Sequence, residues 1–216
     1  MKKIIAAGCF FITLFFASNA QGIKNPSDAK KILDQVSAKF KTYKSVQANF
    51  LLKIDNAAGK NLGTKKGTVS MKATKYAITI PGQVIISDGT TLWTYEKSSN
   101  EVTINKIDPS ANAITPQKLF TNFYDKDFLY KYNGMVTEGG KSMQEIELTP
   151  TDKSKPFFKV LLYITNATIY TTKIFEKAGA RYTYTVNNMK TGLVLADNIF
   201  TFDIKKYPGV EVVDLR

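Results

Sequence analysis

The sequence predicts a mainly β fold with a few helices, built on an antiparallel sheet of about eleven strands. Three observations support this fold class. After Ser45 the apolar residues change from helical spacing to strict alternation, and strand-like segments then recur about every eight to twelve residues. Several of these segments are joined by tight-turn sequences, such as Asp88-Gly89, Ala178-Gly179 and Pro81-Gly82. Together they indicate an antiparallel meander that curves into a sandwich or barrel.

Residues 1–20 have the layout of a cleaved secretory signal. Lys2 and Lys3 precede an apolar run over residues 4–17. Ser18-Asn19-Ala20 then provides the small residues of a cleavage site before Gln21. We expect residues 21–216 to form a single exported domain. Cys9 is the one cysteine and lies within the signal, so the mature domain is expected to lack disulfides and thiolate metal sites.

One amphipathic helix is expected at the start of this domain. Pro26-Ser27-Asp28 is typical of a helix start. Apolar residues follow at helical spacing and leave a lysine-rich outer face: Ala29, Ile32, Leu33, Val36, Phe40 and Tyr43.

The first strand follows at once, because Val46, Ala48, Phe50, Leu52 and Ile54 alternate with mostly polar residues. Ten further strands are expected, near residues 63–73, 75–80, 83–88, 90–96, 101–107, 128–132, 141–149, 157–165, 168–176 and 180–187.

The stretch 107–126 interrupts this meander. Pro116 precedes Leu119, Phe120 and Phe123, which have the spacing of a short helix with an apolar face. Such a helix can lie across the opening of a curved sheet, so the sequence describes a cup with a lid. The interior of a cup of this size either is filled by side chains or holds one apolar ligand.

Composition argues against several kinds of chemistry. The chain has no histidine, which removes the usual catalytic triads, imidazole bases and histidine zinc sites. Glu145 and Glu147 share one strand face, but alternation with apolar residues is typical of a half-solvated strand. We therefore expect a protein that is not an enzyme, with no catalytic residues, no metal and no cofactor.

The positive charge is compatible with two interpretations, of which scattered lysines favour the first: a lysine-rich solvated surface, or a surface for anionic partners. It does not indicate nucleic acid. The formal charge is +12, and +10 remains after the two signal lysines are removed. Such a surface attracts anionic partners, including membrane head groups. The lysines are scattered and are not interleaved with stacking aromatic rings in a nucleic-acid-binding pattern.

The segment VIISDGTTLWTYEKSSNEVTINKID, residues 84–108, resembles the LolA family of periplasmic lipoprotein carriers. SVQANFLLKI near the start and FTFDIKKYPGVEVVDLR at the end extend the resemblance over most of the mature chain. The resemblance implies an unclosed antiparallel β-barrel with a helical lid, whose apolar interior takes up the acyl chains of lipoproteins. It also implies a periplasmic monomer that receives lipoproteins from an inner-membrane ABC transporter and delivers them to an outer-membrane acceptor.

The site residues implied by the resemblance are the inward positions of the strands. For the acyl cavity these are Phe50, Leu52, Val69, Met71, Ile78, Ile80, Trp93, Tyr95, Val102 and Ile104. For the lid they are Ile114, Leu119, Phe120 and Phe123.

One feature departs from the family pattern. Where the family commonly has an arginine that holds the lid closed, next to a proline, this chain has Lys72 and Lys75 without either residue. An ammonium group lacks the planar fork of arginine and would make a weaker latch. The only mature arginines are Arg181 and Arg216.

Two other functions remain open on the sequence alone. One is a general lipid or lipid-intermediate shuttle with the same fold, which would carry free lipid. The other is a sensor or adaptor that uses a filled cup to bind a protein and takes up no lipid.

Overall fold

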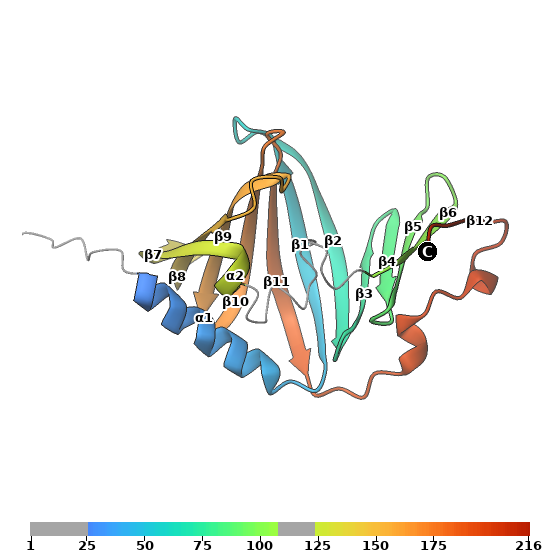
Figure 1. Cartoon of the computed structure of the whole chain (residues 1–216), viewed down its shortest axis with the longest axis horizontal. Helices are drawn as coiled ribbons and strands as arrows, with labels where there is room; N and C mark the ends of the chain where they lie inside the picture. Colours follow the sequence, from blue (N-terminus) through green and yellow to red (C-terminus); the bar gives the residue numbers. More distant parts are fainter. Residues whose placement is uncertain (1–25, 108–123) are drawn as a thin grey trace, which may run out of the picture.

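The computed structural model describes residues 26–107 and 124–216, which form one curved sheet with helices against it (Figure 1). The helices are α1 (Pro26–Lys41) and α2 (Tyr124–Asp127), and two short 3-10 helices are η2 (Asp197–Phe200) and η3 (Ile204–Lys206). The strands are β1 (Val46–Asp55), β2 (Asn61–Lys72), β3 (Lys75–Ile80), β4 (Gln83–Ser87), β5 (Thr91–Glu96), β6 (Glu101–Lys106), β7 (Phe128–Glu138), β8 (Lys141–Pro150), β9 (Phe157–Thr165), β10 (Thr168–Glu176), β11 (Arg181–Thr191) and β12 (Glu211–Asp214).

The twelve described strands form a single sheet in the order β12-β6-β5-β4-β3-β2-β1-β11-β10-β9-β8-β7. Its two ends, β12 and β7, are not paired with each other, so the barrel is unclosed, as expected. All eleven expected strands are present, and β7 is longer than expected. The sequence missed β12, which pairs in parallel with β6 and makes the sheet mixed instead of purely antiparallel.

The N-terminal amphipathic helix is confirmed as α1. Its apolar side packs on β7 to β10, where Ala29, Leu33 and Val36 join a buried cluster with Ile146 and Leu162. The face of the sheet that carries α1 is called the helix face below. At this end of the sheet, α1 covers the helix face and forms a hydrophobic core with it.

The C-terminal segment covers the opposite face, called the tail face below. After β11 the chain runs through η2 and η3 to β12, along the far end of the sheet (Figure 1). Phe202 and Tyr207 pack there against Tyr95, with ring centroids 5.8 and 4.4 Å from the Tyr95 ring. The sequence did not predict this layer, because the segment lacks the periodicity of a helix or a strand.

Two expected elements lie outside the described residues, namely the signal over residues 1–20 and the mid-chain helix near residues 116–124. Only α2, at the end of that stretch, is described. None of the helices within residues 26–107 and 124–216 is long and apolar enough to cross a membrane.

Candidate functional site

Six of the ten expected cavity residues share the helix face. Directly opposite residues of antiparallel strands point to the same side of a sheet. The pairs Val69↔Ile78, Met71↔Val46 and Phe50↔Gly67 therefore align three neighbouring strands. The six are Phe50, Leu52, Val69, Met71, Ile78 and Ile80, called the apolar strip below.

The apolar strip is unevenly covered. Phe50, Leu52 and Met71 are buried, whereas Val69, Ile78 and Ile80 keep part of their surface accessible. Gly67 lies between Phe50 on β1 and Ile80 on β3. A Cβ atom there would lie 2.3 Å from Cζ of Phe50 and 2.7 Å from Cγ2 of Ile80. The missing side chain thus leaves room for the Phe50 ring beside Ile80.

The other four expected cavity residues lie on the opposite face of the sheet. The register of β4, β5 and β6 places these four side chains on the tail face, opposite the apolar strip. They are Trp93, Tyr95, Val102 and Ile104. Tyr95 and Val102 are buried there with Phe202, and Trp93 packs against the same cluster. Alternation separated the two sets of side chains on these strands. It could not identify which set faces the C-terminal segment, because that depends on a part of the chain distant in sequence.

Residues that the sequence analysis did not select extend the apolar strip on both sides. They are Ile85 and Leu92 on β4 and β5, and Tyr182, Tyr184 and Val186 on β11. The Tyr184 ring lies 6.0 Å from that of Phe50, and burial raises the pKa of the Tyr184 phenol. The alternating sequence RYTYTVN, residues 181–187, could have identified the β11 residues as one face of a strand.

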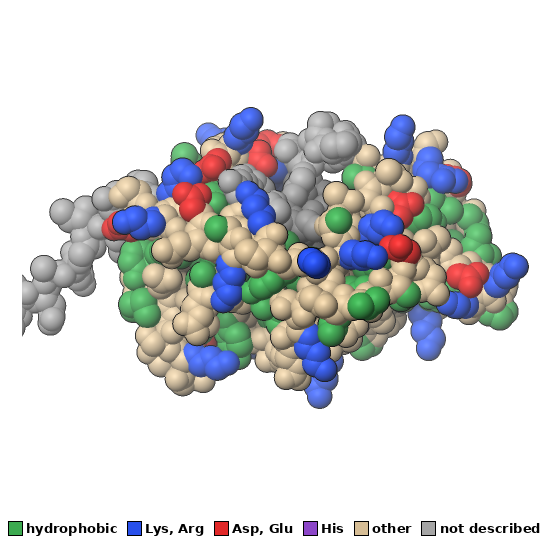
Figure 2. Space-filling model, turned by 90° about the horizontal axis from the view of Figure 1, so that it is seen from below, with side chains coloured by type: hydrophobic (Ala, Val, Ile, Leu, Met, Phe, Trp, Pro, Cys, Tyr) green, Lys and Arg blue, Asp and Glu red, His purple; other side chains and the backbone are tan. Residues whose placement is uncertain are grey.

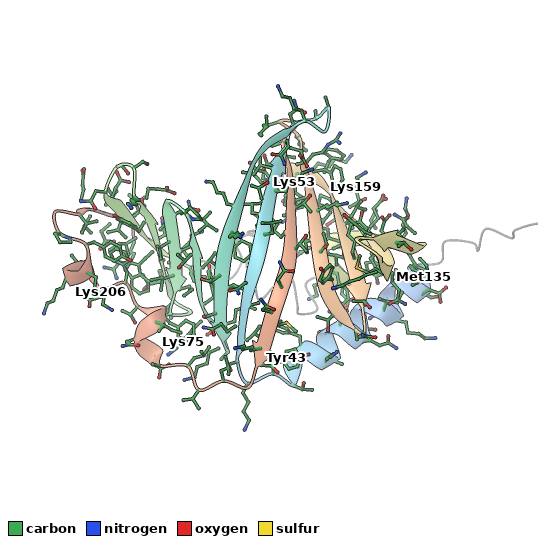
Figure 3. All side chains as sticks on the ribbon, turned by 180° about the vertical axis from the view of Figure 1, so that it is seen from behind. Tyr43, Lys53, Lys75, Met135, Lys159 and Lys206 are labelled. Atoms are coloured by element: carbon green, nitrogen blue, oxygen red, sulfur yellow. The ribbon has the colours of Figure 1, made fainter. Side chains whose placement is uncertain are left out.

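The C-terminal end of α1 closes one end of the apolar strip. Phe40 and Tyr43 pack against a cluster of Val46, Met71 and Tyr76, and Figure 3 shows Tyr43 where α1 passes into β1. A small cavity of about 10 Å³ remains here, lined by Val36, Phe40, Tyr43, Ala167, Thr168 and Met189.

A polar contact joins α1 to α2. The Tyr124 hydroxyl donates to Oδ1 of Asp34 at 2.9 Å, and Nζ of Lys30 lies 3.0 Å from the same carboxylate. The hydrogen bond from Lys30 lowers the pKa of Asp34, while burial and the nearby carboxylate raise the pKa of Tyr124. The four expected lid residues, Ile114, Leu119, Phe120 and Phe123, lie outside the described residues, just before this contact.

Lys72 and Lys75 have a described partner in the C-terminal segment. Their Nζ atoms lie 3.3 and 3.1 Å from Oδ1 of Asp197, and Lys72 also donates to the carbonyl of Leu195. These ion pairs lower the pKa of Asp197. These two lysines thus hold the C-terminal segment against the β2–β3 hairpin.

Part of the segment that carried most of the resemblance is the turn between β4 and β5. Oδ1 of Asp88 accepts from the backbone N–H groups of Thr90 and Thr91 at 2.8 and 2.7 Å. Gly89 has φ of +97°, a conformation that favours glycine. The motif therefore encodes the β4–β5 hairpin.

The carboxylates of Glu145 and Glu147 are held in a local polar network. Asn133 donates to both Glu145 and Glu147, at 2.7 and 3.2 Å, and Lys131 pairs with Glu147. Burial would raise the pKa of Glu147, but these donors outweigh it and lower that pKa. Within residues 26–107 and 124–216, no three Asp, Glu, His or Cys side chains gather as metal ligands.

Comparisons with known proteins agree with this geometry. An outer-membrane lipoprotein carrier protein of Pectobacterium atrosepticum is 30% identical over the whole of both chains, and one of Cupriavidus necator is 28% identical over 98% of each. A solved structure of an uncharacterized conserved protein from Thermus thermophilus has the same fold, with a TM-score of 0.57 and 13% identity over 87% of this chain and 99% of its own. The family model described as outer membrane lipoprotein carrier protein LolA matches residues 41–203, and the chain therefore belongs to the LolA family.

Proposed function

We propose that this protein is a periplasmic carrier that binds the acyl chains of lipoproteins on the apolar strip and moves them from the inner to the outer membrane. The observation that carries the proposal is a row of partly accessible apolar side chains on the helix face, including Val69, Ile78 and Ile80. Monomeric proteins seldom expose contiguous apolar surface without a use for it. Membership of the LolA family supports lipoprotein as the cargo.

The energetics suit a shuttle. Removing an acyl chain of about sixteen carbons from water recovers roughly 12 kcal/mol, at about 0.8 kcal/mol per methylene. A carrier must bind this chain in water and still release it, so part of that free energy has to be offset. We propose that the lid residues Ile114, Leu119, Phe120 and Phe123 compete with the acyl chain for the apolar strip.

Other parts of the proposal rest on the family. An inner-membrane ABC transporter would supply the lipoproteins and an outer-membrane acceptor would receive them. Residues 21–216 would form one monomeric, non-enzymatic domain after removal of residues 1–20. The mature N-terminus at Gln21 can be checked by mass spectrometry of the exported protein.

Native mass spectrometry of protein isolated from its own host tests the cargo. Co-purifying acylated protein is the expected result. Free lipid alone would favour the general lipid shuttle. A protein that arrives empty and also refuses added lipoprotein would favour the protein-binding adaptor.

A pair of adjacent substitutions tests the surface. Ile80→Glu places a carboxylate on the helix face, whereas Thr79→Glu places one on the opposite face of the same strand. Both residues are at least partly exposed, so both variants are expected to fold. Only Ile80→Glu should weaken binding of a fluorescent acyl lipid, by about tenfold or more. Equal binding by both variants would contradict the assignment of the apolar strip.

A further inference from the structure

Three turns meet at the upper end of the sheet in Figure 1. They are the β1–β2 turn at residues 56–60, the β10–β11 turn at 177–180 and the β8–β9 loop at 151–156, and together they are called the hairpin pole below. The Arg181 guanidinium donates to the carbonyl of Ala57, and the Lys177 amide donates to the carbonyl of Pro156 at 2.8 Å. Figure 3 shows Lys53 and Lys159 near this end. The pole is thus one continuous surface.

The hairpin pole is ordered by its own backbone contacts. Oδ1 of Asn56 accepts from the amide of Lys60 at 2.9 Å, and Gly59 reverses the chain with φ of +82°. The β1–β2 hairpin therefore presents its side chains from a defined turn.

Basic residues dominate this pole and the strand ends that lead into it. They include Lys53, Lys60, Lys65, Lys66, Lys159 and Arg181, against the acidic Asp55, Asp152 and Glu176. Lys53 is paired with Asp55 at 3.0 Å, but no described residue pairs with the ammonium groups of Lys60, Lys65 or Lys66. All three of these lysines are exposed. Their charge is therefore available to an external anionic partner.

Exposed apolar side chains accompany these cations. Leu62 is 62% exposed beside the β1–β2 turn, and Phe158 is 49% exposed at the start of β9. The Phe158 ring lies 6.2 Å from that of Phe175, which has Lys159 and Arg181 over its faces. Lysines around isolated apolar side chains match the two parts of a membrane interface, namely anionic head groups and the acyl region beneath them.

We propose that the hairpin pole docks on the surface of a membrane rich in anionic phospholipid. The position of the pole relative to the apolar strip suits this role, because Leu52 of the strip lies directly opposite Lys65 in the sheet. A docked pole brings one end of the strip to the membrane surface. The proposal concerns docking alone and is tested without cargo, so it can fail while the carrier function stands.

Vesicle flotation with the purified protein tests this directly. The protein should bind vesicles of phosphatidylglycerol and phosphatidylcholine but not of phosphatidylcholine alone, and binding should fall as salt is raised. Each lysine near an anionic surface contributes roughly fivefold to binding. Lys60→Gln with Lys66→Gln should therefore weaken binding about 25-fold, and Leu62→Ser should weaken it further.

The opposite end of the molecule provides matched controls. The view from below also shows scattered lysines with hydrophobic side chains between them (Figure 2). Lys44 and Lys190 are exposed near the α1–β1 junction and the end of β11, and Val194 is fully exposed. Lys44→Gln with Lys190→Gln makes the same change in net charge, and Val194→Ser removes an exposed apolar side chain.

The proposal is supported if the control variants still bind the anionic vesicles and the hairpin-pole variants bind them more weakly. Equal loss in both double variants would mean that net charge alone drives binding, and this would overturn it. Absence of any wild-type binding to the anionic vesicles would overturn it as well. Circular dichroism of each variant confirms that the fold is retained.

Discussion

The two halves of the sheet bury opposite faces. From β7 to β10 the helix face is filled by α1, and residues such as Ile146 and Leu162 are fully buried. From β3 to β6 the C-terminal segment instead covers the tail face, where Phe202 is packed against Tyr95 and Val102. In this second half the helix face keeps Ile78 and Ile80 partly accessible.

The difference shows how a curved sheet can have a stable core and still keep an apolar surface for a ligand. Each half needs one well-packed face for stability, because burial of apolar side chains is the main favourable contribution to folding. The C-terminal segment supplies that packing for β3 to β6. The described part of the C-terminal segment does not cover the helix face of those strands, which is the face that the proposed function uses for binding.

Leu162→Asp should prevent stable folding, because it places an unpaired carboxylate in the core beneath α1. The neighbouring Leu161 points to the opposite face and is only partly buried, so Leu161→Asp should be much milder. Urea denaturation followed by circular dichroism compares the two. Similar midpoints would contradict the core assignment.

Phe202→Ala should lower the free energy of unfolding by about 3 to 5 kcal/mol, since Phe202 is a buried ring stacked on Tyr207. Acyl-lipid binding per folded molecule should not change, because this cluster lies on the tail face. Denaturation and lipid titration on the same preparation measure both. Reduced lipid affinity in the folded variant would mean that the two faces are coupled.

Gly67→Val should cost about 1 to 3 kcal/mol, because the new Cβ must displace the Phe50 ring. The displaced ring would also alter the apolar strip, so lipid binding should weaken. Gly63→Val is the control on the same strand, since a Cβ at Gly63 meets no atom within 4 Å. Thermal unfolding and lipid titration should separate the two variants.

Asp34→Asn should have a small effect that depends on pH. The hydrogen bond from Lys30 lowers the pKa of Asp34 in the folded protein. Its contribution to stability is therefore present above the unfolded pKa of about 4 and is lost as pH falls through the lowered folded value. The pair is largely exposed, so the effect is screened and modest. Urea midpoints measured from pH 7 down to pH 2 should converge for wild type and variant.

The smallest expected effect is the change in Trp93 fluorescence when acyl lipid is added. This residue is the only tryptophan, and it lies on the tail face, away from the apolar strip. Adding acyl lipid should leave its emission maximum nearly unchanged. A large blue shift on binding would place the ligand on the wrong face for the proposed function.

Much of this architecture was predictable from local pattern. The spacing of Leu33 and Val36 predicted α1, and alternation predicted the eleven longer strands. The absence of histidine and the resemblance to LolA sequences directed the interpretation away from catalysis and toward a carrier. These features are local or compositional, so they can be read along the chain without knowledge of its folding.

Only the tertiary structure decided which face each apolar set occupies. Phe50 and Ile78 share the helix face, whereas Tyr95 and Val102 alternate just as clearly but pack on the tail face. The physical reason is that alternation defines two faces of a strand, while the partner that buries one of them comes from elsewhere in the chain. Here those partners are α1, from the start of the domain, and the tail that Lys72 and Lys75 hold through Asp197.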